Sequence, residues 1–186
     1  MSANLLTEYI ERISHLMRSL ARSEYSLQPI QLSILRYLAR ANRYSNTPLA
    51  VADYLGLTRG TVSQSIIVLE SKKLIKKTPD KVDGRVVHLH PTRAGSRLVE
   101  KAAPDKAIAR ALKCLPEEEQ NGLLGPLQQL LGSMQKDNNM KAFGECRNCR
   151  YNSQRGRGIY FCELTQENLS PADIELLCRE YEDPLQ

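Results

Sequence analysis

The sequence has no apolar run that approaches the roughly 18 residues needed to span a membrane as a helix. It also lacks a leader-like apolar stretch near its start, because Glu8 and Glu11 interrupt the first hydrophobic residues. These absences exclude a membrane-spanning protein and predict a cytoplasmic one. In that reducing compartment, clustered thiols are expected to be metal ligands or redox groups rather than structural disulfides.

The residue groupings that carry most enzyme chemistry are absent as well. No nucleophile, base and orienting acid stand out as a set, and no glycine-rich loop follows a predicted strand. The three histidines, His15, His88 and His90, have no metal-ligand spacing, so we interpret them as ordinary surface or core residues. Cys114 stands alone on an apolar helix and is expected to be packed. The sequence therefore predicts a protein that is not an enzyme.

Acidic residues are in the minority. The chain has 21 Asp and Glu against 26 Lys and Arg, which gives a formal net charge of +5. Such an excess is compatible with a polyanionic partner. The imbalance is sharpest in segment 57–69, which contains no carboxylate.

Segment 57–90 predicts a helix followed by a two-stranded wing. Thr58 is suited to cap the helix, and Val62, Ile66 and Leu69 recur at helical spacing as one buried face. The opposite face carries side chains suited to base edges and phosphates, namely Arg59, Thr61, Ser63 and Gln64. We expect these to contact the major groove of DNA.

The predicted wing has a strand that starts near Leu74, a tight turn at Asp83-Gly84, and a second strand over residues 85–90. Three lysines near the helix end and the first strand are expected to hold DNA phosphates: Lys72, Lys76 and Lys77.

Amphipathic periodicity predicts helices over residues 4–22, 28–41 and 49–55, and Gly56 gives the turn into the recognition helix. After the wing, a helix over residues 94–115 and another from Pro116 to Met134 have spare apolar faces. We expect the first helix and the last two to bury these faces against a second subunit. The alternative is packing within one chain.

The stretches T-P-L-A-V-A-D-Y-L-G-L-T-R-G-T-V-S-Q-S-I-I-V-L-E-S-K-K-L-I and D-G-R-V-V-H-L-H-P-T-R-A-G resemble the winged-helix core of MarR-type transcriptional regulators. The resemblance covers about residues 5–133. It implies a homodimer on a pseudo-palindromic operator of double-stranded DNA, with Arg85 reaching into the minor groove and Asp83 bracing it. One departure is Lys73, where the family usually has Gly. A left-handed conformation there costs a non-Gly residue about 1 kcal/mol, so we expect a remodelled cap.

A polar hinge over residues 135–139 separates a DNA-binding and dimerisation domain, residues 1–134, from a cysteine-rich extension, residues 143–186. The extension holds four of the five cysteines: Cys146, Cys149, Cys162 and Cys178. Two residues separate the first pair, twelve precede the third and fifteen precede the fourth. Two thiolates on either side of a tight turn can chelate one centre, and the other two complete its shell.

Ser170-Pro171 predicts the start of a helix whose inward face would carry Cys178. An iron–sulfur cluster, [2Fe-2S] or [4Fe-4S], tolerates one close pair plus two dispersed cysteines and is the favoured occupant. Zinc is the alternative, although zinc ribbons more often show two close pairs. Disulfides or redox thiols remain a third possibility. Four nearby arginines either offset thiolate charge, contact DNA phosphate or lie in a solvated loop: Arg147, Arg150, Arg155 and Arg157.

The sequence thus predicts a mainly α fold with a small antiparallel β-wing: a winged helix-turn-helix with dimerisation helices and a cysteine-rich, metal-binding appendix. The favoured function is a homodimeric, sequence-specific transcriptional regulator that senses redox state, oxygen or iron through the cluster. We expect cluster loss to shift the dimer helices and so the spacing of the recognition helices. One alternative is a small-ligand-responsive repressor with a structural zinc; another is a redox or electron-transfer protein.

Overall fold

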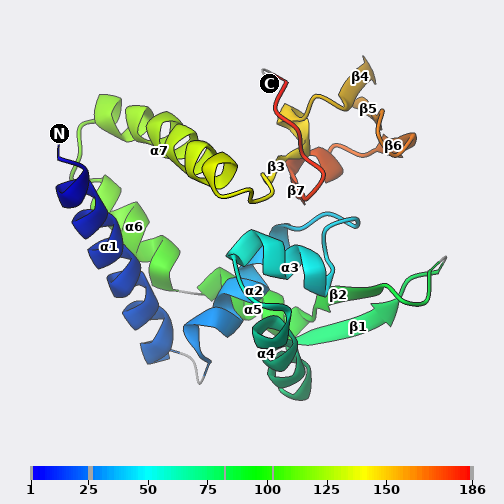
Figure 1. The fold of residues 1–186 in the computed structure, drawn as a ribbon, viewed down its shortest axis with the longest axis horizontal. Helices are drawn as coiled ribbons and strands as arrows, with labels where there is room; N and C mark the ends of the chain where they lie inside the picture. Colours follow the sequence, from blue (N-terminus) through cyan, green and yellow to red (C-terminus); the bar gives the residue numbers. More distant parts are fainter. Residues whose placement is uncertain (1, 25–26, 82, 102, 185–186) are drawn as a thin grey trace.

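The computed structural model describes residues 2–24, 27–81, 83–101 and 103–184 (Figure 1). Four helices and a two-stranded wing form one lobe: α1 (Ala3–Glu24), α2 (Pro29–Arg40), α3 (Pro48–Leu55), α4 (Arg59–Ser71), β1 (Ile75–Pro79) and β2 (Val87–Pro91). The two wing strands are antiparallel, with Ile75 opposite Pro91. This is the mainly helical fold with an antiparallel wing that the sequence predicts. No helix within the described ranges is long and apolar enough to cross a membrane.

The core of the lobe lies where α2, α3, α4 and the wing meet. The predicted inward stripe of α4, Val62, Ile66 and Leu69, is buried there. The hydroxyl of Thr58 accepts a hydrogen bond from the Thr61 N–H at 3.2 Å, which caps α4 as expected. Gly56 ends α3 in the left-handed region with φ 62°. The recognition helix is therefore fixed at both its start and its inner face.

The end of α4 differs from the expectation. The prediction of a remodelled cap is wrong, because Lys73 itself takes the left-handed conformation, with φ 55°. Its N–H bonds to the Glu70 carbonyl at 2.8 Å, and the next N–H, of Leu74, bonds back to Leu69 at 2.9 Å. These bonds satisfy the last carbonyls of the helix and hold an exposed lysine where glycine would be unstrained.

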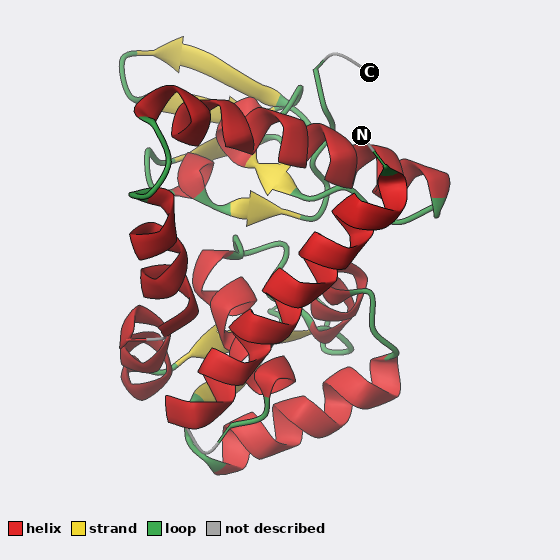
Figure 2. Ribbon diagram, turned by 90° about the vertical axis from the view of Figure 1, so that its left-hand side faces the viewer, coloured by secondary structure: helices red, strands yellow, loops and turns green. Residues whose placement is uncertain are grey.

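Three helices follow the wing: α5 (Arg93–Lys101), α6 (Ala103–Leu112) and α7 (Glu117–Asp137). Helix α5 packs against α2 and β2 of the lobe, with Leu98 and Val99 at its core. The single helix predicted over residues 94–115 is thus two described helices, and residue 102 between them lies outside the described residues. Helix α1 packs against α2 and α6. Figure 2 looks onto this side, where long helices run across the face without a layer over them.

Large apolar side chains stay exposed on the outer helices. No described residue of α7 is buried in the single chain. The exposed residues are Leu5, Tyr9, Ile10, Ile13 and Leu16 on α1 and Leu123, Leu124, Leu127, Leu131 and Met134 on α7. Apolar faces of this size and continuity mark an interaction surface in a protein of ordinary composition.

The C-terminal extension is built from short pieces: β3 (Gly144–Glu145), η1 (Cys146–Asn148), β4 (Asn152–Gly156), β5 (Ile159–Cys162), β6 (Glu167–Leu169), η2 (Asp173–Glu175) and β7 (Leu177–Cys178). Strands β4, β5 and β6 form one antiparallel sheet, and β3 pairs with β7. Figure 1 shows the extension above the α2–α3 side of the lobe.

The helix predicted from Ser170 is wrong. Its capping exchange does form, because Ser170 N–H donates to the Asp173 carboxylate at 2.8 Å and Ser170 Oγ accepts from the Asp173 N–H at 3.2 Å. The chain makes only the single 3-10 turn η2 and then leaves as strand β7. Leu177 is buried in the core of the lobe and its backbone pairs with β3 and with Ala41. These tertiary contacts outweigh the local helix signal.

Candidate nucleic-acid interface and cysteine cluster

The predicted groove-facing residues share one exposed side of α4: Arg59, Thr61, Ser63 and Gln64. The Thr61 hydroxyl lies 2.9 Å from that of Thr58, so it also takes part in the helix cap. No carboxylate interrupts this side before Glu70 at the far end of the helix. The surface therefore offers hydrogen-bonding groups and positive charge in the pattern that suits base edges and phosphates.

The three predicted phosphate-binding lysines, Lys72, Lys76 and Lys77, are all exposed. They are not equivalent, because Lys77 donates to the Glu70 carboxylate at 2.6 Å. An exposed pair of this kind is weak, but it leaves Lys77 less able than Lys76 to give its full charge to a phosphate.

At the wing turn, Asp83 and Arg85 are both exposed. The Asp83 carboxylate accepts the backbone N–H of Arg85 at 3.0 Å. Asp83 in turn donates its own N–H to the Asp80 carboxylate at 2.8 Å. The turn that carries the Arg85 side chain is thus tied internally by two carboxylates.

The four cysteines of the extension converge from separate elements. Cys146 and Cys149 flank the tight turn η1, where the Cys149 N–H bonds to the Cys146 carbonyl at 3.1 Å. Cys162 ends β5 and packs against the cluster around buried Cys146. Cys178 ends β7, opposite Gly144 of β3. Sheet pairing therefore delivers the two distant thiols to the close pair.

Electrostatics show how near the thiols lie. Burial is the largest cause that raises the pKa of Cys146 to about 12, and the neighbouring Cys178, Cys149 and Cys162 contribute to the same rise. Among the described residues, however, no group of three or more His, Cys, Asp or Glu is arranged to hold a metal ion. The thiols are close enough for each to oppose the ionisation of its neighbours, but their sulfurs do not surround a common centre.

The donor set still fits a soft metal centre. Four sulfurs suit zinc or iron–sulfur chemistry, and a bound cation would offset the repulsion between thiolates. Burial raises the pKa of Cys178, whereas hydrogen bonds from the Asn42 side chain, a Glu180 backbone group and the Ser45 side chain act in the opposite direction. Donors aimed at a sulfur are the outer contacts that tune a metal-bound thiolate.

The arginines near the first cysteine pair are mostly engaged with acids of the extension. Arg147 pairs with Glu145 and Glu175, and Arg150 donates to Glu182 at 3.1 Å. Arg155 donates to Glu163 at 3.1 Å and lies over the Phe161 ring. Arg157 is exposed. The paired arginines act first as supports of the extension itself.

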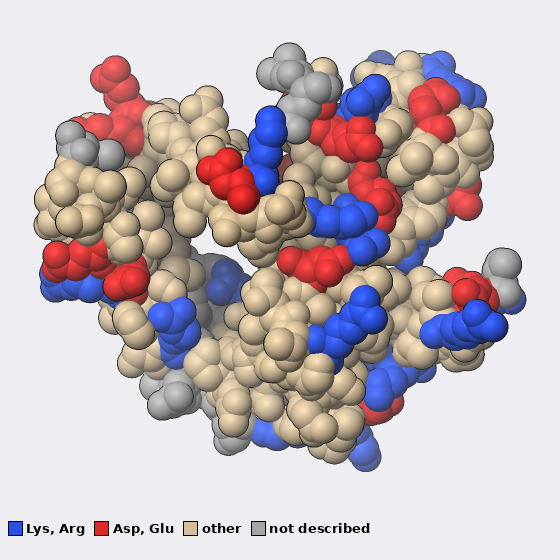
Figure 3. Space-filling view, in the orientation of Figure 1, with Lys and Arg blue, Asp and Glu red and all other residues tan. Residues whose placement is uncertain are grey.

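Sequence reasoning missed the seam between the extension and the lobe. Arg40 donates to Glu145 at 2.9 Å, and Arg179 donates to Asp53 at 2.7 Å. Figure 3 shows acidic and basic side chains side by side along this seam. Phe143 adds an apolar anchor, edge-on to Tyr54 with ring centroids 5.1 Å apart. The sequence feature that could have indicated this contact is the polar run of residues 42–47, which separates two segments with apolar helical periodicity.

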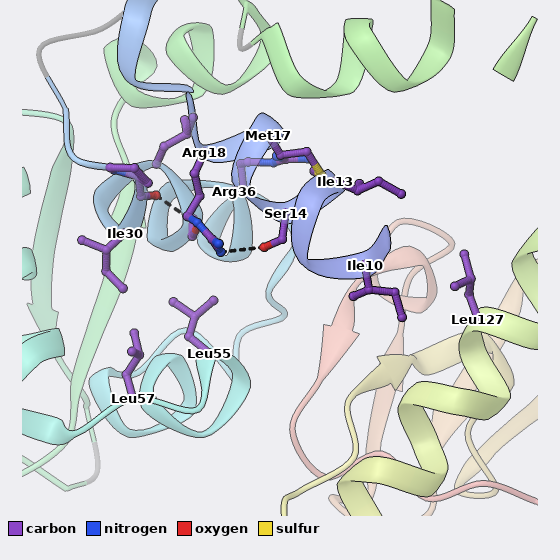
Figure 4. Close-up of a pocket in the computed structure, with 13 residues that line it drawn as sticks. Ile10, Ile13, Ser14, Met17, Arg18, Ile30, Arg36, Leu55, Leu57 and Leu127 are labelled. Atoms are coloured by element: carbon purple, nitrogen blue, oxygen red, sulfur yellow. Dashed lines mark hydrogen bonds between the residues drawn. The ribbon is translucent and has the colours of Figure 1, made fainter. Parts of the chain in front are cut away.

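A groove of about 600 Å³ lies between α1, α2, the end of α3 and α7 (Figure 4). Its walls are mainly apolar, with Ile10, Ile13 and Leu127 at one end and Leu55 and Leu57 at the other. Two arginines, Arg18 and Arg36, also line it, and Arg18 donates to the Ser14 hydroxyl at 2.6 Å. An apolar groove with a few cations suits a small aromatic or aliphatic anion.

Comparisons with known proteins agree with this geometry. The MarR family model matches residues 25–86. The S. aureus MepR–DNA complex is 29% identical, with 70% of this chain and 98% of that chain covered and a TM-score of 0.60. No curated protein matches the chain.

Two more distant structures share the fold alone. A MarR transcriptional regulator from Methanosarcina mazei Go1 is 16% identical, covering 72% of this chain and 99% of that chain, with a TM-score of 0.63. CouR from Rhodococcus jostii RHA1, bound to p-coumaroyl-CoA, is 22% identical, covering 68% of this chain and 88% of that chain, with a TM-score of 0.56.

Proposed function

We propose that this chain is a DNA-binding transcriptional regulator of the MarR type, because the MarR family model matches residues 25–86 and the winged helix-turn-helix there has the expected exposed face. The observation that carries the proposal is the exposed, acid-free side of α4 beside a wing whose turn holds Arg85. MepR, at 29% identity, has been solved in complex with DNA. In the matching geometry, α4 enters a major groove of double-stranded DNA and the wing turn follows the adjacent minor groove.

The regulator would act as a homodimer on a pseudo-palindromic site. The support is the unpartnered apolar surface of α1 and α7, which a second copy would cover around a two-fold axis. Two α4 helices related by that axis reach successive major grooves only if the site has matching half-sites about one DNA turn apart.

Selection of bound duplexes from a random-sequence pool tests this function. The proposal expects recovery of an inverted repeat, with an affinity that falls steeply as salt rises because phosphate contacts release counterions. Recovery of no enriched sequence, together with salt-insensitive binding, would remove the regulator assignment. That result would instead favour the alternative in which the protein is a redox or electron-transfer protein that uses its four cysteines.

The finer proposal is that the regulator senses redox state, oxygen or iron through an iron–sulfur cluster held by Cys146, Cys149, Cys162 and Cys178. The support is the convergence of four thiols, the burial of the first pair and the polar side chains of Asn42 and Ser45 beside Cys178. A bound cluster would supply one-electron chemistry and sensitivity to oxygen. Structural zinc is the competing occupant of the same sulfurs.

Analysis of oxygen-free protein separates these occupants. An iron–sulfur cluster gives visible absorption together with iron and acid-labile sulfide, and these signals disappear in air. Colourless protein with one zinc per chain would assign a structural site and end the sensor proposal. Cys178→Ser should lower the content of either metal, whereas Cys114→Ser should not. Cys114 lies outside the cluster and is exposed after the end of α6, so the prediction that it is packed on a helix is wrong.

A second candidate function rests on the groove between α1, α2 and α7. Its apolar walls and two arginines would admit an aromatic carboxylate, whose binding would change the angle between the dimer helices and the lobe. Release of bound DNA by a panel of aromatic carboxylates, with no effect of metal removal, would favour this function. Arg36→Met should then weaken the response while leaving the unliganded protein bound to DNA.

A further inference from the structure

The extension contacts the lobe at the α2–α3 loop, residues 41–47. The Asn42 N–H donates to the Leu177 carbonyl at 2.9 Å, and Ala41 forms a β-bridge with the same residue. Leu177 is buried among the core residues of the lobe. Cys178, the next residue, is therefore held at the lobe surface by backbone contacts that do not involve the dimer helices.

The same loop touches Cys178 with side chains. The Asn42 and Ser45 side chains are polar neighbours of Cys178, and Ser45 Oγ accepts the N–H of the next residue, Arg179, at 2.8 Å. Ser45 is fully buried, so water cannot replace the protein partners of its hydroxyl. A metal-bound thiolate is a stronger acceptor for these groups than a neutral thiol. The order of the loop is thus sensitive to the state of Cys178.

The opposite side of the loop holds the wing. The Asn46 carbonyl accepts the Leu89 N–H of β2 at 2.7 Å. The Asn46 side-chain oxygen lies 2.6 Å from Nδ1 of His88. Asn46 is only 6% exposed, so both contacts are made in a dry environment where they are hard to replace.

From His88 the contacts continue to the wing turn. Its Nε2 lies 2.9 Å from Asp80 Oδ2, and the other Asp80 oxygen accepts the Asp83 N–H at 2.8 Å. Asp83 accepts the backbone N–H of Arg85. Polar contacts on both sides of the loop, linked by the peptide bond between Ser45 and Asn46, therefore join the surroundings of Cys178 to the residue at the tip of the wing.

We propose that the α2–α3 loop is a relay through which ligation of Cys178 orders the wing and sets the position of Arg85. The inference rests on the proposed four-thiolate site and names the part of the DNA interface that this site regulates. It differs from the expected route through the dimer helices, because the loop contacts Leu177 and Arg179 on one side and His88 and Leu89 of β2 on the other. Metal loss then loosens the minor-groove contact while the inward face of α4 stays packed.

The amide of Leu89 gives a direct readout, since its acceptor is the Asn46 carbonyl. Hydrogen exchange is measured on metal-loaded protein and on the same protein after anaerobic treatment with EDTA. We expect the Leu89 amide and the 80–88 segment to exchange about fivefold faster after metal removal, the loss expected for one weakened hydrogen bond. Amides of α4 serve as the internal reference and should not change.

Two variants separate the relay from general loosening. Asn46→Ala keeps the backbone carbonyl that accepts the Leu89 N–H but removes the side-chain contact to His88. The freed loop should let Leu89 exchange fast whether or not metal is bound, with metal content unchanged. His88→Gln, which keeps one polar contact of the ring, should do so to a smaller extent and covers the case in which Asn46→Ala does not fold. Arg150→Ala, at an exposed ion pair in the extension, is the matched control and should keep the wild-type response.

Coupling between two sites is reciprocal in binding free energy, so Asn46→Ala should also weaken metal binding about fivefold, measured by equilibrium competition with EDTA. Metal that is bound and removed with no change at Leu89 would overturn the relay and leave the four-thiolate site standing. Equal acceleration in α4 and the wing would overturn it as well, by showing global loosening. Absence of iron and zinc from oxygen-free protein would instead overturn the site on which the relay depends.

Discussion

The side chains proposed to face DNA fall into two groups: some would contact base edges, and others would contact phosphates. Gln64 stands on the outer side of α4 with an amide that can both donate to and accept from a base edge. Lys76 stands beside the wing as an exposed point charge. The two residues are separated by position and by chemistry, so their substitution should have different signatures.

Gln64→Ala should change base preference at one position of each half-site, by about 1–3 kcal/mol of discrimination. Lys76→Ala should weaken binding equally across sequences and reduce the salt slope by about one. Binding to a panel of single-base operator variants at several salt concentrations measures both effects. Uniform weakening by Gln64→Ala would show that this residue does not read a base.

Lys77→Ala should reduce the slope less than Lys76→Ala, because Glu70 already pairs with Lys77.

Lys73 is a residue-scale site of backbone strain. Its φ of 55° is unfavourable for a side chain with a Cβ, and the side chain is exposed. Lys73→Gly should therefore raise the free energy of unfolding by up to about 1 kcal/mol, after the greater flexibility of glycine in the unfolded chain is deducted. Urea denaturation measures the change; a loss of stability would mean that Lys73 makes a compensating contact.

At the scale of elements, the join between the wing and α5 depends on close backbone approach. A Cβ on Gly95 would lie 2.2 Å from the Leu74 carbonyl oxygen, which is backbone and has little room to move. The Thr92 hydroxyl donates to the Lys73 carbonyl at 2.8 Å and accepts the Gly95 N–H at 3.2 Å. This short T-x-x-G segment fixes the start of α5 against the end of α4.

Gly95→Ala should destabilise the protein by about 1–3 kcal/mol through overpacking. Gly122→Ala is the matched control, because that glycine lies inside α7 with nothing within 4 Å of the added carbon. The control should be neutral or stabilising by up to about 1 kcal/mol, as expected for alanine inside a helix. Thermal unfolding of both variants tests the contrast, and equal effects would contradict the close approach.

Elements with strong local signals could be predicted from the sequence. Thr58, Gly56 and the stripe from Val62 to Leu69 carry their own capping and periodicity, and the structure confirms each. The segment after Ser170 has an equally good helix start, yet burial of Leu177 in the lobe redirects it into a strand. Contacts between distant segments decide that outcome, and periodicity within a segment does not report them.

The candidate site was predictable only in part for the same reason. Exposure of Arg59 and Gln64 follows from their place opposite a buried stripe. The importance of Asn42, Ser45 and Asn46 does not, because their partners lie 42 or more residues away in sequence. The roles assigned to the DNA-facing residues and to the four cysteines remain predictions.

For the whole molecule, the exposed faces of α1 and α7 predict assembly with a second copy. Leu124 is 63% exposed on α7, so Leu124→Glu should leave the lobe folded but disrupt the dimer and weaken DNA binding. Leu164→Glu, at a position 47% exposed on the extension, is the control and should remain dimeric. Sedimentation equilibrium distinguishes the two; an unchanged mass for Leu124→Glu would place the dimer surface elsewhere.

The central claim is that metal binding to the four cysteines changes the affinity of the winged helix for DNA. Its most direct test is the affinity of one protein preparation for a selected duplex, measured without oxygen before and after EDTA treatment. We predict that metal removal weakens binding about 5- to 150-fold, the usual range of coupling between sites, while the base preference set by α4 is kept. Equal affinity before and after removal would contradict the claim.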